Sequence, residues 1–401
     1  MHEWDAMESE FYRTKLDNGL TVLLERRKSP VVTSLLAYRL GAAREPAEFK
    51  GVAHYLEHCI FQGTKTKSFK EISAVVEKHG GILNGSTEEE VTTFWTKLPS
   101  KYLDLGVDLL SDMLANPAFD ERKIEKEKKV VLEEVKMHHD TPTTYVFERA
   151  KSFLYEKPFG MKIVGTEKTI KPISREILLS FFDLYNDPVL CVVGEADFDE
   201  VVEAAERKIT VKRMPPSKLK INKINKQAVE RRKGLKQAHL VLAFHTATLR
   251  DRRRYALESF NAIFSDGGSS RLFQEIRDKR GLAYHVRSYP QIGVDYGHNL
   301  IYVGTDAGHV KQVKELILKE IKKMRELDKK EFEESKEQLI GRYKLIQEDS
   351  WRVALALLWE ELAGSAEEFY RYEQRISELK LQDVRELGKL KRYSFAALVP
   401  K

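Results

Sequence analysis

The segment DERKIEKEKKVVLEEV, residues 120–135, has a second version 208 positions later in the chain, DKKEFEESKEQLIGRY at residues 328–343. Both segments carry apolar residues at the spacing that lines one face of a helix. The shared stripe consists of Ile124, Val131 and Val135 in the first segment and Phe332, Leu339 and Tyr343 in the second. The two segments therefore predict two copies of one helix, and with them a duplicated domain.

The order of strands and helices also repeats around these segments, as hydrophobic periodicity indicates. In the first region, strands are expected at 11–16, 20–27, 31–40, 90–98 and 187–194, and helices at 50–61, 69–79, 102–115, 121–139 and 198–208. The first two strands flank Asp17-Asn18-Gly19, a sequence typical of a tight hairpin turn. In the second region, a strand at 237–246, a helix at 254–264 and a closing strand at 393–400 resume the same order. The fold class predicted from this pattern is α+β.

The length of 401 residues exceeds the size at which a single hydrophobic core usually keeps growing. We expect two homologous domains, at 1–210 and 237–401. Residues 211–236, VKRMPPSKLKINKINKQAVERRKGLK, are rich in Lys and Arg and contain Pro215-Pro216. Such a segment is either an exposed interdomain linker or a docking patch for an acidic partner, and its position between two structured regions favours the linker.

Composition narrows the classes of function. The net charge is +6, and the 68 basic and 62 acidic residues are interspersed, so no nucleic-acid partner is expected; binding through the basic segment is a minor alternative that predicts salt-sensitive retention. No apolar run is long enough to span a bilayer, and the amino terminus lacks the pattern of a secretion signal, so no membrane partner is expected. With only Cys59 and Cys191, the chain indicates no disulfide framework and fits a reducing cytoplasm.

The stretch HYLEH, residues 54–58, raises the question of metal binding. On a helix, His54, Glu57 and His58 share one face, and both imidazoles reach a common point. Apolar residues occupy the opposite stripe, so the histidines are not needed for the core. Two imidazoles and one carboxylate suit zinc, with a reactive water at the remaining position. Two surface histidines on an ordinary helix would give the same letters, so the pattern alone leaves both interpretations open.

The third zinc ligand is expected from the acidic helix at 120–135, because Glu57 is needed as the base. On that helix Glu134 and Glu127 flank the apolar stripe, whereas Glu133 points away from it. We therefore predict Glu134 as the buried carboxylate, with Glu127 supporting the site from one side. In the second copy Glu127 is replaced by Ser335 and Glu134 by Arg342, as expected if only the first copy performs chemistry. A fully solvated acidic helix is the alternative.

Beyond these patterns, the whole chain resembles the inverzincins, zinc peptidases of the pitrilysin and mitochondrial processing peptidase type, which share an H-x-x-E-H signature. The stretches that carry the resemblance are GVAHYLEHCIFQGT, GGILNGSTEEEVTTFW, EKKVVLEE and SSRLFQEIRDKRGLAYHV. The resemblance implies one zinc ion per chain bound by His54, His58 and Glu134. It also implies that Glu57 is the general base and that Glu127 corresponds to the earlier acidic residue of the family.

The same resemblance implies residues that contact the substrate. Arg277 and Tyr284 match an arginine and a tyrosine that stabilise the oxyanion in the family. The stretch GGILNGST matches the edge strand that pairs with an extended peptide, where Asn84 is the residue expected to touch it. The family usually has alanine at the position of Gly85, a departure that bears on local rigidity.

The resemblance finally implies an architecture and an assembly. Each domain is expected to be a mainly antiparallel sheet flanked by helices, and the two domains to form half of the clamshell seen in four-repeat relatives. We therefore expect a homodimer with composite sites, in which Arg277 and Tyr284 serve the partner's zinc. The predicted function is that of a zinc endopeptidase acting on peptides or unfolded segments. The alternative is a non-catalytic structural or partner subunit of a related peptidase.

Overall fold

The structure is a computed structural model that describes residues 10–209, 211 and 219–401. The chain divides into two compact units. The first comprises Met1–Val135, Lys162–Leu219 and Ile346–Glu361, and the second comprises Lys136–Met161, Lys220–Leu345 and Leu362–Lys401. The sequence predicted contiguous domains at 1–210 and 237–401, whereas each unit also contains a short segment from the other half of the chain.

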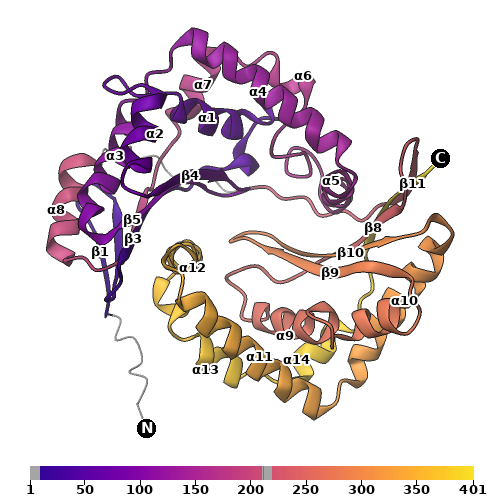
Figure 1. The fold of residues 1–401 in the computed structure, drawn as a ribbon. Coiled ribbons are helices and arrows are strands. Elements are labelled where there is room, and N and C mark those ends of the chain that lie inside the picture. Colours follow the sequence, from indigo (N-terminus) through magenta and orange to yellow (C-terminus); the bar gives the residue numbers. More distant parts are fainter. Residues whose placement is uncertain (1–9, 210, 212–218) are drawn as a thin grey trace. The chain divides into compact units, whose positions relative to one another are not determined.

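The described residues of the first unit form a six-stranded sheet with the order β1-β2-β6-β3-β5-β4 (Figure 1). Its strands are β1 (Glu10–Lys15), β2 (Thr21–Arg26), β3 (Val31–Tyr38), β4 (Ile82–Thr87), β5 (Thr92–Pro99) and β6 (Val189–Gly194). Neighbouring strands are antiparallel except β2 and β6, which are parallel. The predicted hairpin is confirmed, and Gly19 in its turn has a φ of 101°, a conformation that favours glycine.

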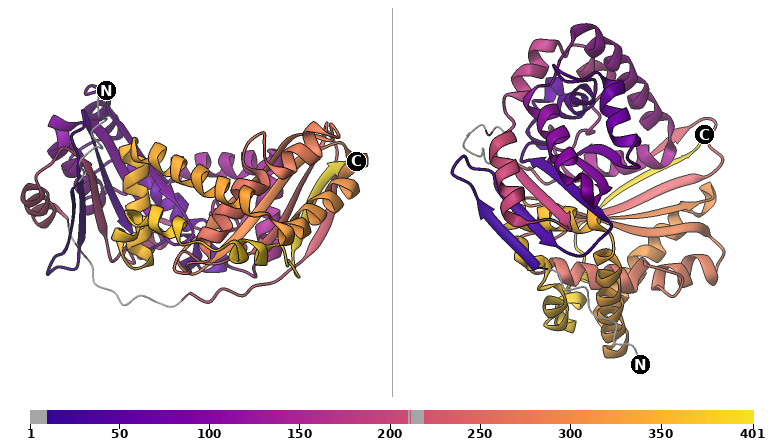
Figure 2. Two further views of the ribbon diagram at one scale, coloured as in Figure 1. Left: turned by 90° about the horizontal axis from the view of Figure 1, so that it is seen from below. Right: turned by 60° about the vertical axis from the view of Figure 1, so that its left-hand side comes forward.

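The described residues of the second unit form a five-stranded sheet with the order β7-β11-β8-β10-β9. Its strands are β7 (Gln227–Arg232), β8 (Ala238–His245), β9 (Ala283–Ile292), β10 (Gly297–Thr305) and β11 (Ser394–Pro400). They fan out in Figure 2, as the natural twist of a sheet requires. Strand β7 is parallel to β11 and the other pairs are antiparallel. In order and direction, these strands match β2, β6, β3, β5 and β4 of the first sheet, which confirms the duplication and the α+β class.

Strand β7 corrects the prediction of a linker at 211–236. Its six residues form the edge of the second sheet and pair with β11, from Phe395↔Gln227 to Pro400↔Arg232. Exposed and half-buried residues alternate along QAVERR, and its charged side chains suit an edge strand. The Lys-rich context hid this strand in the sequence. Pro215 and Pro216 lie outside the described residues.

Helices pack against both faces of each sheet. Those of the first half are α1 (Val52–Phe61), α2 (Phe69–Glu77), α3 (Leu103–Ala115), α4 (Glu121–Asp140), α5 (Pro142–Leu154), α6 (Glu167–Ile170), α7 (Arg175–Phe182) and α8 (Phe198–Lys208). Those of the second half are α9 (Arg254–Ser265), the π-helical turn η4 (Phe273–Asp278), α10 (Val310–Lys323), α11 (Lys329–Gln347), α12 (Ser350–Ala363), α13 (Tyr372–Ser377) and α14 (Leu381–Leu387). In the first unit, Leu56 of α1 and Leu110 of α3 join Leu36 and Phe94 of the sheet in one buried core.

Helices α5 and α12 are the segments that the two halves exchange. Helix α5 packs against β8 and β11 of the second sheet, where Ser394 Oγ donates a hydrogen bond of 2.8 Å to Phe153 O. Helix α12 belongs to the first unit: Ser350 Oγ lies 2.8 Å from Thr33 Oγ1, and the Trp351 ring contacts Trp95. Each exchanged helix directly follows one of the duplicated helices, α4 or α11, so the exchange is reciprocal.

The duplicated stripe is buried as predicted. Ile124 and Val131 of α4 are inaccessible to solvent, Val135 is half-buried, and the three counterparts on α11 are buried. Across the part of the chain that the structure describes, no helix combines the length and the apolar character needed to cross a bilayer.

Candidate metal centre

Helix α1 presents His54 and His58 on the face opposite its buried stripe. The buried side chains on the helix include Val52, Tyr55, Leu56, Cys59 and Ile60, as the sequence pattern predicted. The hydroxyl of Tyr55 donates a hydrogen bond of 2.6 Å to Ile124 O and so fixes α1 against α4. Both histidines remain half-buried at the junction of the two helices.

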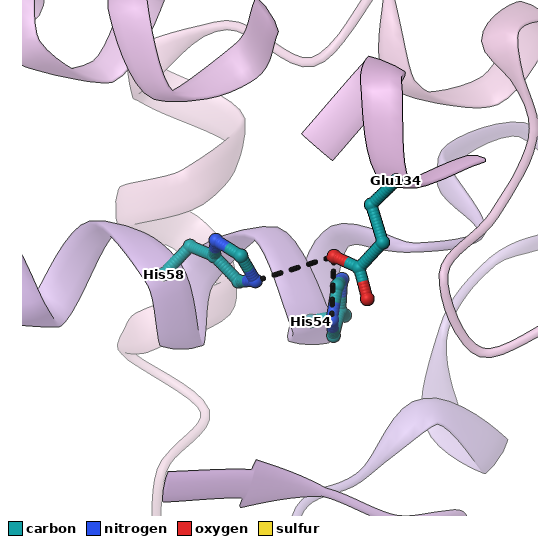
Figure 3. Close-up of side chains that lie close together, drawn as sticks. All are labelled: His54, His58 and Glu134. Atoms are coloured by element: carbon teal, nitrogen blue, oxygen red, sulfur yellow. Dashed lines mark ion pairs between the residues drawn. The ribbon is translucent and has the colours of Figure 1, made fainter. Parts of the chain in front are cut away.

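The side chains of His54, His58 and Glu134 converge on one point (Figure 3). Their ligand atoms all lie within 4.8 Å of one another, and Glu134 Oε2 is 3.5 Å from Nε2 of each histidine. A tetrahedral zinc with bonds of about 2.0–2.1 Å separates its ligand atoms by roughly 3.3 Å, so this spacing fits the ion. Glu134 is half-buried and Glu133 is exposed, in agreement with the prediction from the helix face.

A second layer of contacts orients His58. Its Nδ1 lies 2.9 Å from Glu127 Oε1, and Gln62 Nε2 donates to Glu127 Oε2 at 2.8 Å. Because an ionised carboxylate only accepts hydrogen bonds, Nδ1 of His58 carries the proton and Nε2 is left as the ligand atom. Burial lowers the pKa of His58, but the hydrogen bond to Glu127 and the charges of Glu57 and Glu134 outweigh it and raise that pKa. Gln62, the residue directly after α1, was not predicted from the sequence.

Glu57 points toward β4. The hydroxyl of Thr87, the last residue of that strand, donates a hydrogen bond of 2.6 Å to Glu57 Oε2. Burial raises the pKa of Glu57, which the bond from Thr87 and the charge of His58 partly offset, while the charge of Glu134 raises it further. A carboxyl group with a raised pKa is suited to take up a proton near neutral pH. Sequence reasoning did not find Thr87.

Strand β4 lies at an edge of the first sheet and pairs with β5 alone among the described strands. Asn84 is exposed, and its Oδ1 accepts a hydrogen bond of 2.8 Å from Gly85 N. A Cβ at position 85 would lie 3.0 Å from the Phe61 ring and 3.1 Å from Glu57 Oε1. The usual alanine of the resembling family would therefore require its neighbours to shift by a few tenths of an ångström.

Arg277 and Tyr284 contact each other within the second unit. The Arg277 guanidinium carbon lies 4.3 Å from the centroid of the Tyr284 ring, and its Nη1 donates to Tyr284 O at 3.1 Å. Tyr284 is 81% exposed, which is unusual for an aromatic residue. Arg277 comes from η4 and Tyr284 from β9.

The second copy lacks the donor set. Arg342, at the position of Glu134, forms an ion pair with Asp266, and Ser335, at the position of Glu127, forms a hydrogen bond of 2.7 Å with Ser259. Among the described residues, the cluster of His54, His58 and Glu134 is the one group of three that can hold a metal ion.

Comparison with known proteins shows the family of this chain. Residues 21–167 match the family model "Insulinase (Peptidase family M16)" and residues 172–339 match "Peptidase M16 inactive domain". The chain is 32% identical to the uncharacterized zinc protease YmxG of Bacillus subtilis, over 84% of this chain and 85% of that one. It is 35% identical to an uncharacterized zinc protease of Rickettsia felis, over 79% of this chain and 77% of that one. The chain therefore belongs to peptidase family M16.

Solved structures share the fold over nearly the whole chain. A protease from Helicobacter pylori superposes with a TM-score of 0.90 at 22% identity, covering 98% of this chain and 100% of that one. A peptidase M16 inactive domain from Pseudomonas fluorescens gives a TM-score of 0.89 at 17% identity, covering 98% of each chain. At these identities the likeness shows the two-domain fold, and the chemistry must be argued from the site itself.

Proposed function

We propose that this chain is a zinc-dependent endopeptidase. The observation that carries the proposal is the convergence of the ligand atoms of His54, His58 and Glu134 within 4.8 Å. The buried carboxylate of Glu57 lies on α1, the helix that also carries both histidines. Zinc bound there would lower the pKa of a water molecule and polarise a peptide carbonyl. Glu57 would take the proton from that water and deliver it to the leaving amine. Glu127 would hold the His58 ring through Nδ1 while the reaction proceeds.

The edge strand β4 supports a peptide as the substrate. Its outer side offers backbone groups to an extended chain, which adds to the sheet by main-chain hydrogen bonds. This mode of binding requires an unfolded or flexible segment, since a folded protein has few free extended stretches. Asn84 is exposed on this strand and would contact the bound peptide. Arg277 and the exposed Tyr284 would stabilise the oxyanion.

Four variants test the proposal by metal content and peptide cleavage. We expect about one zinc per chain in the wild type, loss of zinc in His58→Ala and Glu134→Gln, and retention in Glu133→Gln, the matched control on the exposed side of α4. Glu57→Gln should keep its zinc but cleave an unstructured peptide about 10²–10⁴-fold more slowly. Normal cleavage by zinc-loaded Glu57→Gln would refute the mechanism. A zinc-loaded wild type that cleaves no peptide library would instead support the alternative, a partner subunit of another peptidase.

We also propose a homodimer in which Arg277 and Tyr284 of one chain act on the zinc site of the other, in the cytoplasm. The support is indirect: the chain holds two copies of the domain, and the zinc cluster and the Arg277–Tyr284 pair belong to different units. Mixing inactive Glu57→Gln with inactive Arg277→Ala protein should restore activity. A mixed dimer would contain one site in which intact Glu57 from one chain is combined with intact Arg277 from the other. No rescue after demonstrated subunit exchange would exclude sites shared between chains.

A further inference from the structure

We infer that Thr87 is a positioning residue for the proposed base: its hydroxyl holds Glu57 Oε2, so that Oε1 is the oxygen that accepts the proton. The inference rests on the proposed peptidase function and adds a residue and an atom to it. It starts from a buried polar contact between α1 and β4 that the zinc cluster does not use. Thr87 is 8% exposed and Glu57 is 9% exposed.

The two oxygens of Glu57 have different surroundings. Oε2 accepts the short hydrogen bond from Thr87, whereas Oε1 accepts no hydrogen bond from the described residues. A carboxylate attached through three rotatable bonds would otherwise turn either oxygen toward the zinc site. One fixed donor on Oε2 removes that freedom, because a hydroxyl–carboxylate bond at this length is charge-assisted and strong. Oε1 is thereby left with its lone pairs available for a proton.

The backbone of β4 leaves space beside this second oxygen. Gly85 and Thr87 are two residues apart, so they present the same face of the strand to α1. A Cβ at position 85 would lie 3.1 Å from Oε1, and glycine leaves that volume open. Strand β4 thus fixes Glu57 Oε2 through the side chain of Thr87. It leaves space beside Oε1 because Gly85 has no side chain.

This arrangement connects peptide binding to the base. The strand that orients Glu57 is the same edge strand that the proposed substrate would extend. A peptide that pairs with β4 would therefore lie along the strand whose Thr87 hydroxyl holds Glu57. Loss of the hydroxyl should therefore reduce kcat more than it raises KM, since substrate pairing depends on the backbone.

The experiment compares Thr87→Val, which keeps the shape and loses the hydroxyl, with Thr87→Ser, which keeps the hydroxyl. The matched control is Thr92→Val: Thr92 lies opposite Thr87 on β5, is fully buried, and donates its 2.7 Å hydrogen bond to Leu40 O instead of Glu57. We expect Thr87→Val to bind zinc normally and to lose kcat by up to about 10²-fold with KM within about twofold of the wild type. Thr87→Ser should recover most of that loss, and Thr92→Val should retain kcat even where its melting temperature falls.

A second measurement does not require turnover. A peptide hydroxamate binds zinc and gives its hydroxyl proton to the base, so its affinity, measured by calorimetry, reports on Glu57. Thr87→Val alone should weaken the affinity for the hydroxamate at least fivefold. The same substitution added to Glu57→Gln should leave that affinity unchanged. Equal weakening in both backgrounds, or a kcat loss shared by Thr92→Val, would overturn the inference. A wild type that binds the hydroxamate but cleaves no peptide would refute the endopeptidase function while the titration still decides the role of Thr87.

Discussion

Replacing Lys50 by methionine should destabilise the first unit far more than loss of a shorter ion pair on its surface. Lys50 and Glu45 are both fully buried, with Nζ 3.1 Å from Glu45 Oε2. The Glu45 carboxylate also accepts hydrogen bonds from the amides of Gly51, at 3.1 Å, and Ala53, at 2.6 Å, at the start of α1. The pair therefore neutralises a charge that caps the helix carrying both histidines.

The size of the effect follows from burial. Lys50→Met leaves the carboxylate in an apolar interior without its cation, and breaking a buried pair in this way costs about 3–5 kcal/mol. The control is Lys171→Met in the same unit, whose partner Glu167 lies 2.6 Å away, with both side chains more than 60% exposed. An exposed pair is worth about 0–1 kcal/mol. Distance alone would rank the two pairs in the opposite order.

Tryptophan fluorescence during urea unfolding measures this difference. Trp95, Trp351 and Trp359 all belong to the first unit, so the signal of the described residues reports on its unfolding.

The effect of Lys50→Met should depend on pH. Burial raises the pKa of Glu45, and the charge of Lys50 lowers it. Without Lys50 the pKa of Glu45 in the folded protein rises further above its value in the unfolded chain. The stability of the variant is therefore retained below the unfolded-state pKa of Glu45 and is lost as the pH rises through the folded-state pKa. The deficit of Lys50→Met should thus be larger at pH 8 than at pH 5. A deficit below about 1 kcal/mol at pH 8, or one equal to that of Lys171→Met, would refute the reasoning.

Two further predictions concern the stability of the units. Burial, with the charges of Lys151 and His245, lowers the pKa of His298 to about 3. The unfolded chain therefore takes up a proton below about pH 6.5 that the folded chain does not, and stability should fall by about 2 kcal/mol between pH 7.5 and 5. His298→Gln should flatten this dependence in denaturant titrations and the exposed His139→Gln should not; an unchanged slope in His298→Gln would contradict the assignment. A fragment ending at residue 219 lacks α12, and losing the burial of Val353, Leu357 and Leu358 costs about 5–9 kcal/mol, comparable to the stability of a domain. It should fail to fold without residues 220–401, whereas cooperative unfolding of the isolated fragment by circular dichroism would show that α12 is dispensable.

The sequence correctly predicted features that depend on a single helix or strand. The periodicity of α4 separated the half-buried Glu134 from the exposed Glu133, because a helix fixes the direction of each side chain relative to its apolar stripe. The hairpin, the buried strands and the duplication were predictable for the same reason. Each depends on local spacing, on turn chemistry, or on a comparison of the chain with itself.

The contacts between distant segments were not predictable in this way. Thr87 meets Glu57 because β4 and α1 pack together, and no spacing in the sequence records that proximity. The exchange of α5 and α12 was not predictable either. The apolar face of an amphipathic helix indicates that the helix packs against another surface, but it does not indicate which sheet provides that surface. Strand β7 was hidden because an edge strand tolerates the charges that otherwise suggest a linker.

The duplication explains why the metal cluster occurs once among the described residues. The buried stripe of α4 and α11 carries the packing in both copies, so those positions stay apolar whatever the flanks contain. The flanking positions contact neighbouring helices without forming the core, and they are free to change their chemistry. In the first copy Glu134 lies beside two imidazoles, whereas in the second copy Arg342 forms an ion pair with Asp266. The second copy thereby keeps the fold and is free to offer another surface, of which the exposed Tyr284 beside Arg277 is the clearest part.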